Sequence, residues 1–245
     1  MLAEKDDLER ALRYPYTRPE GSFLLDRGEC HPLPASLDFR NRIPVLASGS
    51  NAAPEQLMRK FPKEGNFAPV FVTAAQLQGF CCVYSAHFSG YGAVPATLHP
   101  SQTGGTRCHI TWLTPDQLSR MHETEAVGKN YRYSRLERLS LTCDVTGRLE
   151  MAHAYISRFG ALAPDGTPVA LAELPGDRGD FSALTQRQIQ EKIKTTLAPD
   201  TELGDFIREN ILSAPIREQR TEKMGPISLP FSYSFETVLQ GHQEP

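Results

Sequence analysis

Short apolar runs separated by turn residues fill the middle of the chain, and their length and composition predict β-strands. Most of the runs contain β-branched or aromatic residues, which favour a pleated, half-buried surface. A glycine-containing stretch at 102–106 lies between two of the runs and predicts a hairpin turn. The predicted strands are residues 43–47, 68–73, 80–84, 94–98, 108–113, 131–141 and 150–158.

The first predicted strand leads into a Gly-Ser-Asn turn, which predicts the start of a helix over 54–60. Gly49 can adopt a positive φ at no steric cost, Asn51 is a favoured N-cap, and Pro54 is tolerated in a first helical turn. Such a joint directs several backbone N–H groups at one place, which attracts a carboxylate, a phosphate or a developing oxyanion. The alternative is a turn with a purely structural role.

A second helix is predicted to begin at Thr114. Thr114 as N-cap and Gln117 three residues later form the sequence pattern of a capping box. Leu118, Met121 and Glu125 then follow at positions i, i+3 and i+7, which lie on one helical face. Glu125 therefore continues an apolar stripe that we expect to face the core.

This position distinguishes Glu125 from Glu123, which lies about 200° around the helix and should face water. A carboxylate on a core-facing stripe loses hydration, so we expect its pKa to rise toward the range useful for proton transfer. The alternative is that the helix ends near Ala126 and that Glu125 closes it at the surface.

The composition changes after residue 166, and the stretch 174–180, rich in Gly, Pro and Asp, predicts a linker. Amphipathic helices are predicted over 185–197 and 202–212, and the apolar stripe of the second must pack on another surface. Residues 231–235 alternate apolar with polar side chains, which fits a terminal strand or a plug.

Together these patterns divide the chain into an N-terminal arm (1–42), a core (43–165) and a C-terminal extension with two amphipathic helices (166–245). The arm holds a short charged helix and a stretch rich in Pro, Arg and Gly. Short strands with a few helices, and no regular β-α alternation, indicate the α+β fold class rather than a doubly wound sheet.

Composition and charge narrow the function classes. The chain has 245 residues, of which 40% are hydrophobic and 22% charged, and its net charge is −3. A near-neutral chain without a basic face makes nucleic acid or an anionic membrane an unexpected partner. No apolar run approaches the roughly 18 residues that span a bilayer, and the charged N-terminus lacks the pattern of a secretion signal. We therefore expect a cytoplasmic protein.

The five cysteines occur without regular spacing, and their odd number argues against a disulfide framework. Cys81 and Cys82, with His87 nearby, suggest a metal or thiol site, but no companion ligands occur at metal-binding spacing. Vicinal cysteines in an apolar strand are more often core residues, so we expect no bound metal.

Four motifs resemble, in order, those of the γ-glutamylcyclotransferase-like superfamily. The loop of that family, Tyr-Gly-Ser-Asn-Leu, corresponds to residues 48–52, and its glutamate motif corresponds to Glu125-Ala-Val with Tyr131 downstream. Residues 94–98 and 109–113 are similar to the two strands between these motifs. The chain departs from the pattern at Ser48, where the family has tyrosine, at the leucine after the loop, which is alanine here, and at the glycine after the glutamate, also alanine.

The resemblance implies a small curved mixed β-sheet or partial barrel with flanking helices. It implies cleavage of a γ-glutamyl amine or peptide, in which the substrate's own α-amine closes a lactam, 5-oxoproline, and releases the amine. Glu125 matches the catalytic acid/base of the family. No cofactor is implied, and a homodimer is compatible with the resemblance. The residues implied to bind substrate are Ser48, Gly49, Ser50, Asn51 and Tyr131.

Three function classes stay open at this stage. The first is a cyclising enzyme of the kind that the resemblance implies. The second is a relative that kept the pocket as a binding or scaffold protein, which the loss of the motif tyrosine at Ser48 suggests. The third is an amidase or acyl-transfer enzyme that uses Cys81 or Cys82 with a histidine.

Overall fold

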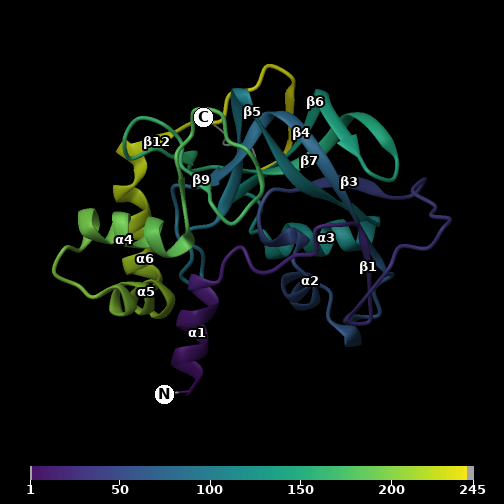
Figure 1. Cartoon of the computed structure of the whole chain (residues 1–245). Coiled ribbons are helices and arrows are strands. Elements are labelled where there is room, and N and C mark those ends of the chain that lie inside the picture. The colour runs from purple at the N-terminus through teal and green to yellow at the C-terminus, as the bar shows by residue number, and fades with distance from the viewer. Residues whose placement is uncertain (1, 242–245) are drawn as a thin grey trace.

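The computed structural model describes residues 2–241, and an eleven-stranded mixed sheet lies at its centre (Figure 1). A separate pair is formed by β12 and β8. The strands are β1 (Phe23–Asp26), β2 (Glu29–His31), β3 (Ile43–Ala47), β4 (Val70–Tyr84), β5 (Ala96–Leu113), β6 (Tyr131–Cys143), β7 (Gly147–Ser157), β8 (Ala161–Leu162), β9 (Ala170–Leu171), β10 (Gly176–Asp177), β11 (Ala183–Leu184), β12 (Ser228–Leu229) and β13 (Glu236–Gln240).

Five strands of the sheet close into a ring. Their hydrogen-bonded order is β5-β3-β7-β6-β4, and β4 pairs again with β5. The pairing of β3 with β7 is parallel, whereas the other four pairings of the ring are antiparallel. The structure thus confirms the predicted α+β class with a curved mixed sheet, and the five-stranded core is closed into a barrel.

Helices cover the sheet in two groups (Figure 1). In that view α4, α5 and α6 lie together on one side, while α2 and α3 lie next to each other below the sheet on the other side. The helices are α1 (Leu2–Leu12), α2 (Pro54–Lys60), α3 (Pro115–Thr124), α4 (Gln186–Leu197), α5 (Leu203–Leu212) and α6 (Ala214–Lys223), with 3₁₀ turns η1 (Ser50–Ala52), η2 (Lys63–Gly65) and η3 (Gly225–Ile227).

A hydrophobic cluster fixes α2 and α3 against the sheet. Leu57 of α2 and Met121 of α3 are fully buried and belong to the same cluster as Val45 and Ala47 of β3. Burial of one such side chain contributes about 1.5–3 kcal/mol. The packing therefore holds the ends of both helices at a defined place beside the end of β3.

The predicted hairpin at 102–106 is wrong, because β5 runs through this stretch as one strand that pairs with β4 on both sides of it. Gly104 serves close packing rather than a turn, since a Cβ atom there would lie 2.6 Å from Cys81 Sγ. The two predicted strands 68–73 and 80–84 likewise fall on one strand, β4, which begins at Val70 and has an irregularity at Gly79, whose φ is +79°.

The C-terminal extension agrees with the sequence in its first two helices, since α4 and α5 match the predicted ranges. Helix α6 was not predicted. Of the two alternatives for 231–235, a terminal strand or a plug, the strand is wrong, because β13 begins only at Glu236. Phe231 stacks on Phe80, and Tyr233 donates to the carbonyl of Glu137 over 2.7 Å.

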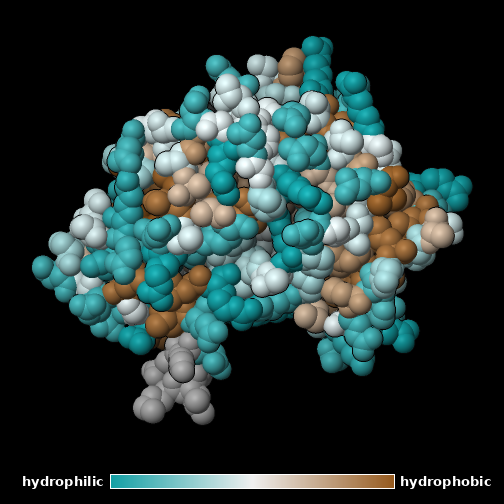
Figure 2. All heavy atoms as spheres, viewed as in Figure 1, coloured by the Kyte–Doolittle hydropathy of each residue, from teal (hydrophilic) through white to brown (hydrophobic). Residues whose placement is uncertain are grey.

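Strands from all three sequence segments join the one sheet. β1 of the arm pairs with β4, while β10 and β13 of the extension pair with β5 and β6. None of the described helices is both long and apolar enough to cross a membrane. Hydrophilic residues cover most of the face shown in Figure 2, and the hydrophobic areas on it are small and separate.

Candidate active site

A cavity of about 190 Å³ lies where the loop after β3, the end of α3 and the start of β6 meet. All six residues that the sequence picked out line this one cavity, although they are up to 83 positions apart in the chain (131 − 48). They are Ser48, Gly49, Ser50, Asn51, Glu125 and Tyr131. The other lining residues are Tyr14, Leu46, Gln56, Lys60, His87, Ser89, Gly90, Tyr91, Pro95, Ala96, Thr124, Asn130 and Tyr155.

Glu125 is the C-cap of α3, with φ −87° and ψ −4°. The helix ends just before it, and Ala126, with φ +49°, turns the chain away. The helix thus ends where the alternative interpretation placed its end. The side chain nevertheless stays inside, because it is only 13% exposed and lines the cavity.

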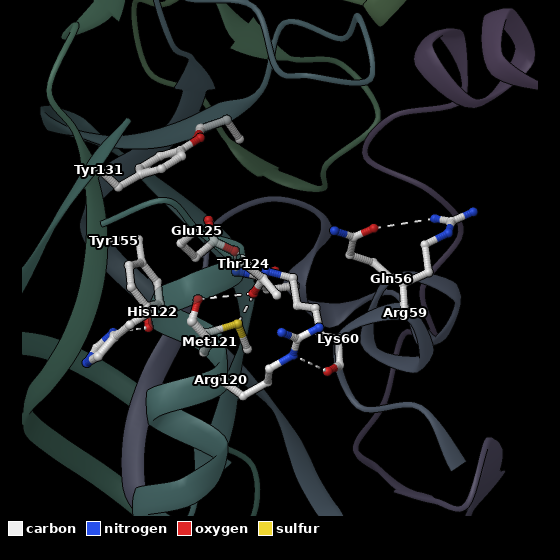
Figure 3. A network of polar contacts seen from close by, with 12 residues as sticks. Gln56, Arg59, Lys60, Arg120, Met121, His122, Thr124, Glu125, Tyr131 and Tyr155 are labelled. Atoms are coloured by element: carbon white, nitrogen blue, oxygen red, sulfur yellow. Dashed lines mark hydrogen bonds and ion pairs between the residues drawn. The ribbon is translucent and has the colours of Figure 1, made fainter. Parts of the chain in front are cut away.

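The Glu125 carboxylate is bound by two groups from other elements, of which Lys60 is labelled in Figure 3. The amide Nδ2 of Asn51 donates to Glu125 Oε1 over 3.0 Å, and the ammonium of Lys60 pairs with the same oxygen. Charge-assisted contacts of this kind are stronger than neutral hydrogen bonds. The glycine loop, α2 and α3 are therefore joined through one carboxylate.

The loop after β3 differs in detail from the sequence prediction. Gly49 has φ −147°, so the positive φ expected there is wrong. Glycine is needed because a Cβ atom would lie 2.3 Å from the hydroxyl oxygen of Tyr14 and 2.9 Å from Cβ of Ala96. The loop backbone therefore lies directly against Tyr14 and Ala96.

Asn51 is not the N-cap of α2, because the 3₁₀ turn η1 intervenes and Ala53 occupies the cap position. Its side chain is thereby free to reach Glu125. The 3₁₀ turn η1 begins at Ser50, with Gly49 as its N-cap, and the first N–H groups of such a turn have no partner within it. The backbone of Ser50 hydrogen-bonds the Tyr14 phenol, so of these donors only those that follow Ser50 are left for a ligand.

Lys60 is the main residue of the cavity that the sequence did not reveal. It is the last residue of α2 and is only 3% exposed. Its ammonium also lies 3.3 Å from Met121 Sδ, and its carbonyl accepts a hydrogen bond from Arg120 Nε (Figure 3). A lysine at a helix C-terminus usually faces solvent, so only the packing of α2 on α3 identifies it.

Tyr14 brings a tyrosine hydroxyl from the N-terminal arm to the loop in which Ser48 replaces the motif tyrosine. The phenol oxygen accepts the backbone N–H of Ala96 over 2.8 Å and lies against Gly49. Burial, together with the negative charge of Glu125, raises the pKa of Tyr14. The phenol is therefore neutral at physiological pH.

Tyr131 is buried in the same wall, and its hydroxyl donates to the carbonyl of Ala96 over 3.1 Å. Burial raises the pKa of Tyr131 well above its usual value, and the nearby phenol of Tyr14 and charge of Glu125 add to this effect. Because its hydroxyl proton is used by the backbone, Tyr131 presents its ring and a phenol oxygen to the cavity.

His87 is a buried, neutral histidine in the wall. Its Nδ1 lies 2.6 Å from Ser85 Oγ, and its Nε2 has no hydrogen-bond partner among the described residues. Burial lowers the pKa of His87 to about 3, so the ring carries no charge at neutral pH.

The two vicinal cysteines do not line this cavity. Cys82 lies in the sheet, with its sulfur 3.4 Å from Thr106 Oγ1, and burial raises the pKa of its thiol to about 11. A thiolate is the nucleophilic form of cysteine, and burial disfavours it here. The geometry gives no support to the thiol-based alternative.

Proteins similar to this chain were found among solved structures alone. No protein-family model and no curated protein matches the sequence. Among solved structures, the chain is similar to a γ-glutamyl cyclotransferase (15% identity, TM-score 0.38, 79% of this chain and 91% of that one). It is also similar to an uncharacterized protein from Homo sapiens (15%, 0.39, 80% and 92%) and to a protein from Arabidopsis thaliana (16%, 0.36, 49% and 72%).

The first of these structures carries the name of the family that the sequence motifs resemble. A likeness at this level of identity and TM-score carries no function over to this chain.

Proposed function

We propose that the chain is a γ-glutamylcyclotransferase-like enzyme that cleaves a γ-glutamyl amine or peptide by intramolecular cyclisation. The products are 5-oxoproline and the free amine, and Glu125 is the general acid/base. The observation that carries this proposal is the contact between Glu125 and Asn51, which joins the two matching motifs across one small cavity.

The reaction moves two protons from the substrate's α-nitrogen to the nitrogen that leaves. Glu125 takes the first from the α-ammonium, which frees the lone pair for attack on the δ-carbonyl. The new C–N bond closes the lactam, the old C–N bond breaks, and the second proton leaves the ring nitrogen. Both protons end on the released amine, which departs as an ammonium ion, so no water is consumed.

Positioning outweighs proton transfer in this scheme. General acid–base catalysis contributes roughly 10²–10⁴-fold, which is about 3–5 kcal/mol. Holding an amine against a carbonyl in reactive geometry contributes about 7–11 kcal/mol. A cavity of about 190 Å³ walled by buried tyrosines suits a curled glutamyl chain better than an extended one.

The 3₁₀ turn after Gly49 supplies the remaining requirement. Negative charge develops on the carbonyl oxygen as the amine attacks, and N–H donors fixed in advance stabilise such an oxyanion. The N–H groups of η1 that follow Ser50 serve this purpose, and the loss of one such donor typically costs 10²–10³ in rate.

The test is release of 5-oxoproline from a panel of γ-glutamyl amines and peptides, with Glu125→Gln as the decisive variant. We expect Glu125→Gln to lower kcat by roughly 10²–10⁴-fold, because glutamine cannot exchange the proton. Glu123→Gln is the matched control. Glu123 lies two residues earlier, is exposed and pairs with Arg120, so its loss should leave turnover unchanged.

A second function, ligand binding without turnover, is favoured by Ser48 in the place of the motif tyrosine. It would be supported if γ-glutamyl compounds raised the melting temperature while no member of the panel released 5-oxoproline. Full turnover by Glu125→Gln would contradict the catalytic role of this residue.

A further inference from the structure

Of the described residues that line the cavity, Lys60 is the only lysine or arginine and Glu125 the only acid. The two are paired, and Lys60 has no other carboxylate partner in the described part of the chain. The cavity therefore contains one buried positive and one buried negative charge, which neutralise each other.

A buried ion pair of this kind is poor evidence for a stabilising role. Desolvation of two charges costs several kcal/mol per ion, and an apolar pair of similar volume is often as stable. Removing only one partner is far worse, because it leaves a buried charge without a counter-ion. A ligand that displaces Lys60 from Glu125 must therefore offer a new partner to each of them.

We propose that Lys60 binds the α-carboxylate of the substrate and thereby restricts the cavity to ligands with an unblocked α-amino-acid head group. This inference rests on the proposed function and names the part of the substrate that it recognises. In the complex, Glu125 contacts the α-ammonium and Lys60 the α-carboxylate, so two ion pairs replace one and no charge stays unpaired.

In this complex, Lys60, the N–H groups of η1 and Glu125 each bind a different group of the substrate. The α-carboxylate on Lys60 leaves the N–H groups of η1 to the carbonyl oxygen, and it releases Glu125 to accept the ammonium proton. Arg59, the neighbouring cation, is not available for this role. It is engaged by Glu55 and Gln56 and is absent from the cavity wall (Figure 3).

Two ligands and two variants test the inference. The ligands are a γ-glutamyl anilide with a free α-carboxylate and the same anilide with an α-carboxamide. The wild type should prefer the free carboxylate by roughly 10²-fold or more in kcat/KM, as expected for loss of one buried ion-pair partner. Lys60→Met should reduce this preference to within a few-fold, and exposed Lys63→Met should keep it.

The preference for the free α-carboxylate is also measured by calorimetry, as the ratio of the dissociation constants of the two anilides. Because binding does not require turnover, this measurement tests the role of Lys60 separately from the cyclisation. Binding with the carboxylate preference but without release of aniline would contradict the cyclisation and retain the role of Lys60. Turnover with equal kcat/KM for both anilides, or an unchanged preference in Lys60→Met, would overturn the role of Lys60. If Lys60→Met fails to fold, Lys60→Gln takes its place, and Lys60→Arg should retain the preference.

Discussion

At the residue scale, one carboxylate, that of Glu125 at the end of α3, joins the glycine loop to α2 through Asn51 and Lys60. Helical phase with Leu118 and Met121 predicts that Glu125 faces the core, and its side chain is only 13% exposed even though the helix ends one residue earlier. The sequence suggests Gly49 as a site of positive φ, but its φ is −147°. Its small size is required by Tyr14, which lies 35 positions earlier (49 − 14), and no local pattern reports such a contact.

His87 gives a pH-dependent prediction at this scale. Burial lowers the pKa of His87 to about 3 from an ordinary value of 6.5, so the folded state binds fewer protons than the unfolded state between these values. The corresponding stability is present above pH 6.5 and is lost as the pH falls toward 3, with a slope of up to about 1.4 kcal/mol per pH unit.

The measurement is the free energy of unfolding of the wild type and of His87→Asn by urea titration between pH 7 and 4. We expect a shallower slope for His87→Asn, whatever its absolute stability, because asparagine does not titrate. Replacement of the exposed His31 by Gln is the control and should keep the wild-type slope. Equal slopes in all three proteins would contradict the burial of a neutral His87.

At the element scale, helices α2 to α5 begin within one residue of their predicted starts, whereas α6 and the full lengths of β4 and β5 were not predicted. The capping box of α3 is present as expected, with Thr114 and Gln117 bonded to each other's backbone N–H groups. The long strand β5 was divided at the glycines of 102–106, because glycine marks a turn more often than a close approach between neighbours. Whether a glycine marks a turn or a close approach depends on the strand that pairs with it, and the sequence alone does not show that strand.

The cap of α3 provides a prediction for this element. Thr114→Ala removes the hydroxyl that accepts the N–H of Gln117 and should lower the free energy of unfolding by about 1 kcal/mol. Thr185→Ala removes the equivalent cap of α4, which does not border the cavity. Both variants should lose similar stability, but only Thr114→Ala should lower kcat/KM, since α3 ends at Glu125. Equal activity of the two variants would show that the cap does not position the carboxylate.

At the scale of the whole molecule, tertiary packing assembles the cavity from segments that no sequence window contains. Tyr14 comes from the N-terminal arm and Lys60 from the end of α2, and neither belongs to a motif that the resemblance covers. The loop, the glutamate and the fold class were therefore predictable from the sequence. The counter-ion of the glutamate and the tyrosine beside the loop required the structure.

In the proposed reaction, the substrate's own amine and not water cleaves the amide in the cavity of Glu125. The most direct measurement is mass spectrometry of the products formed from a γ-glutamyl anilide in ¹⁸O-enriched water. Cyclisation predicts unlabelled 5-oxoproline in amounts equal to the released aniline. Glutamate carrying one ¹⁸O atom would show hydrolysis and contradict the cyclisation.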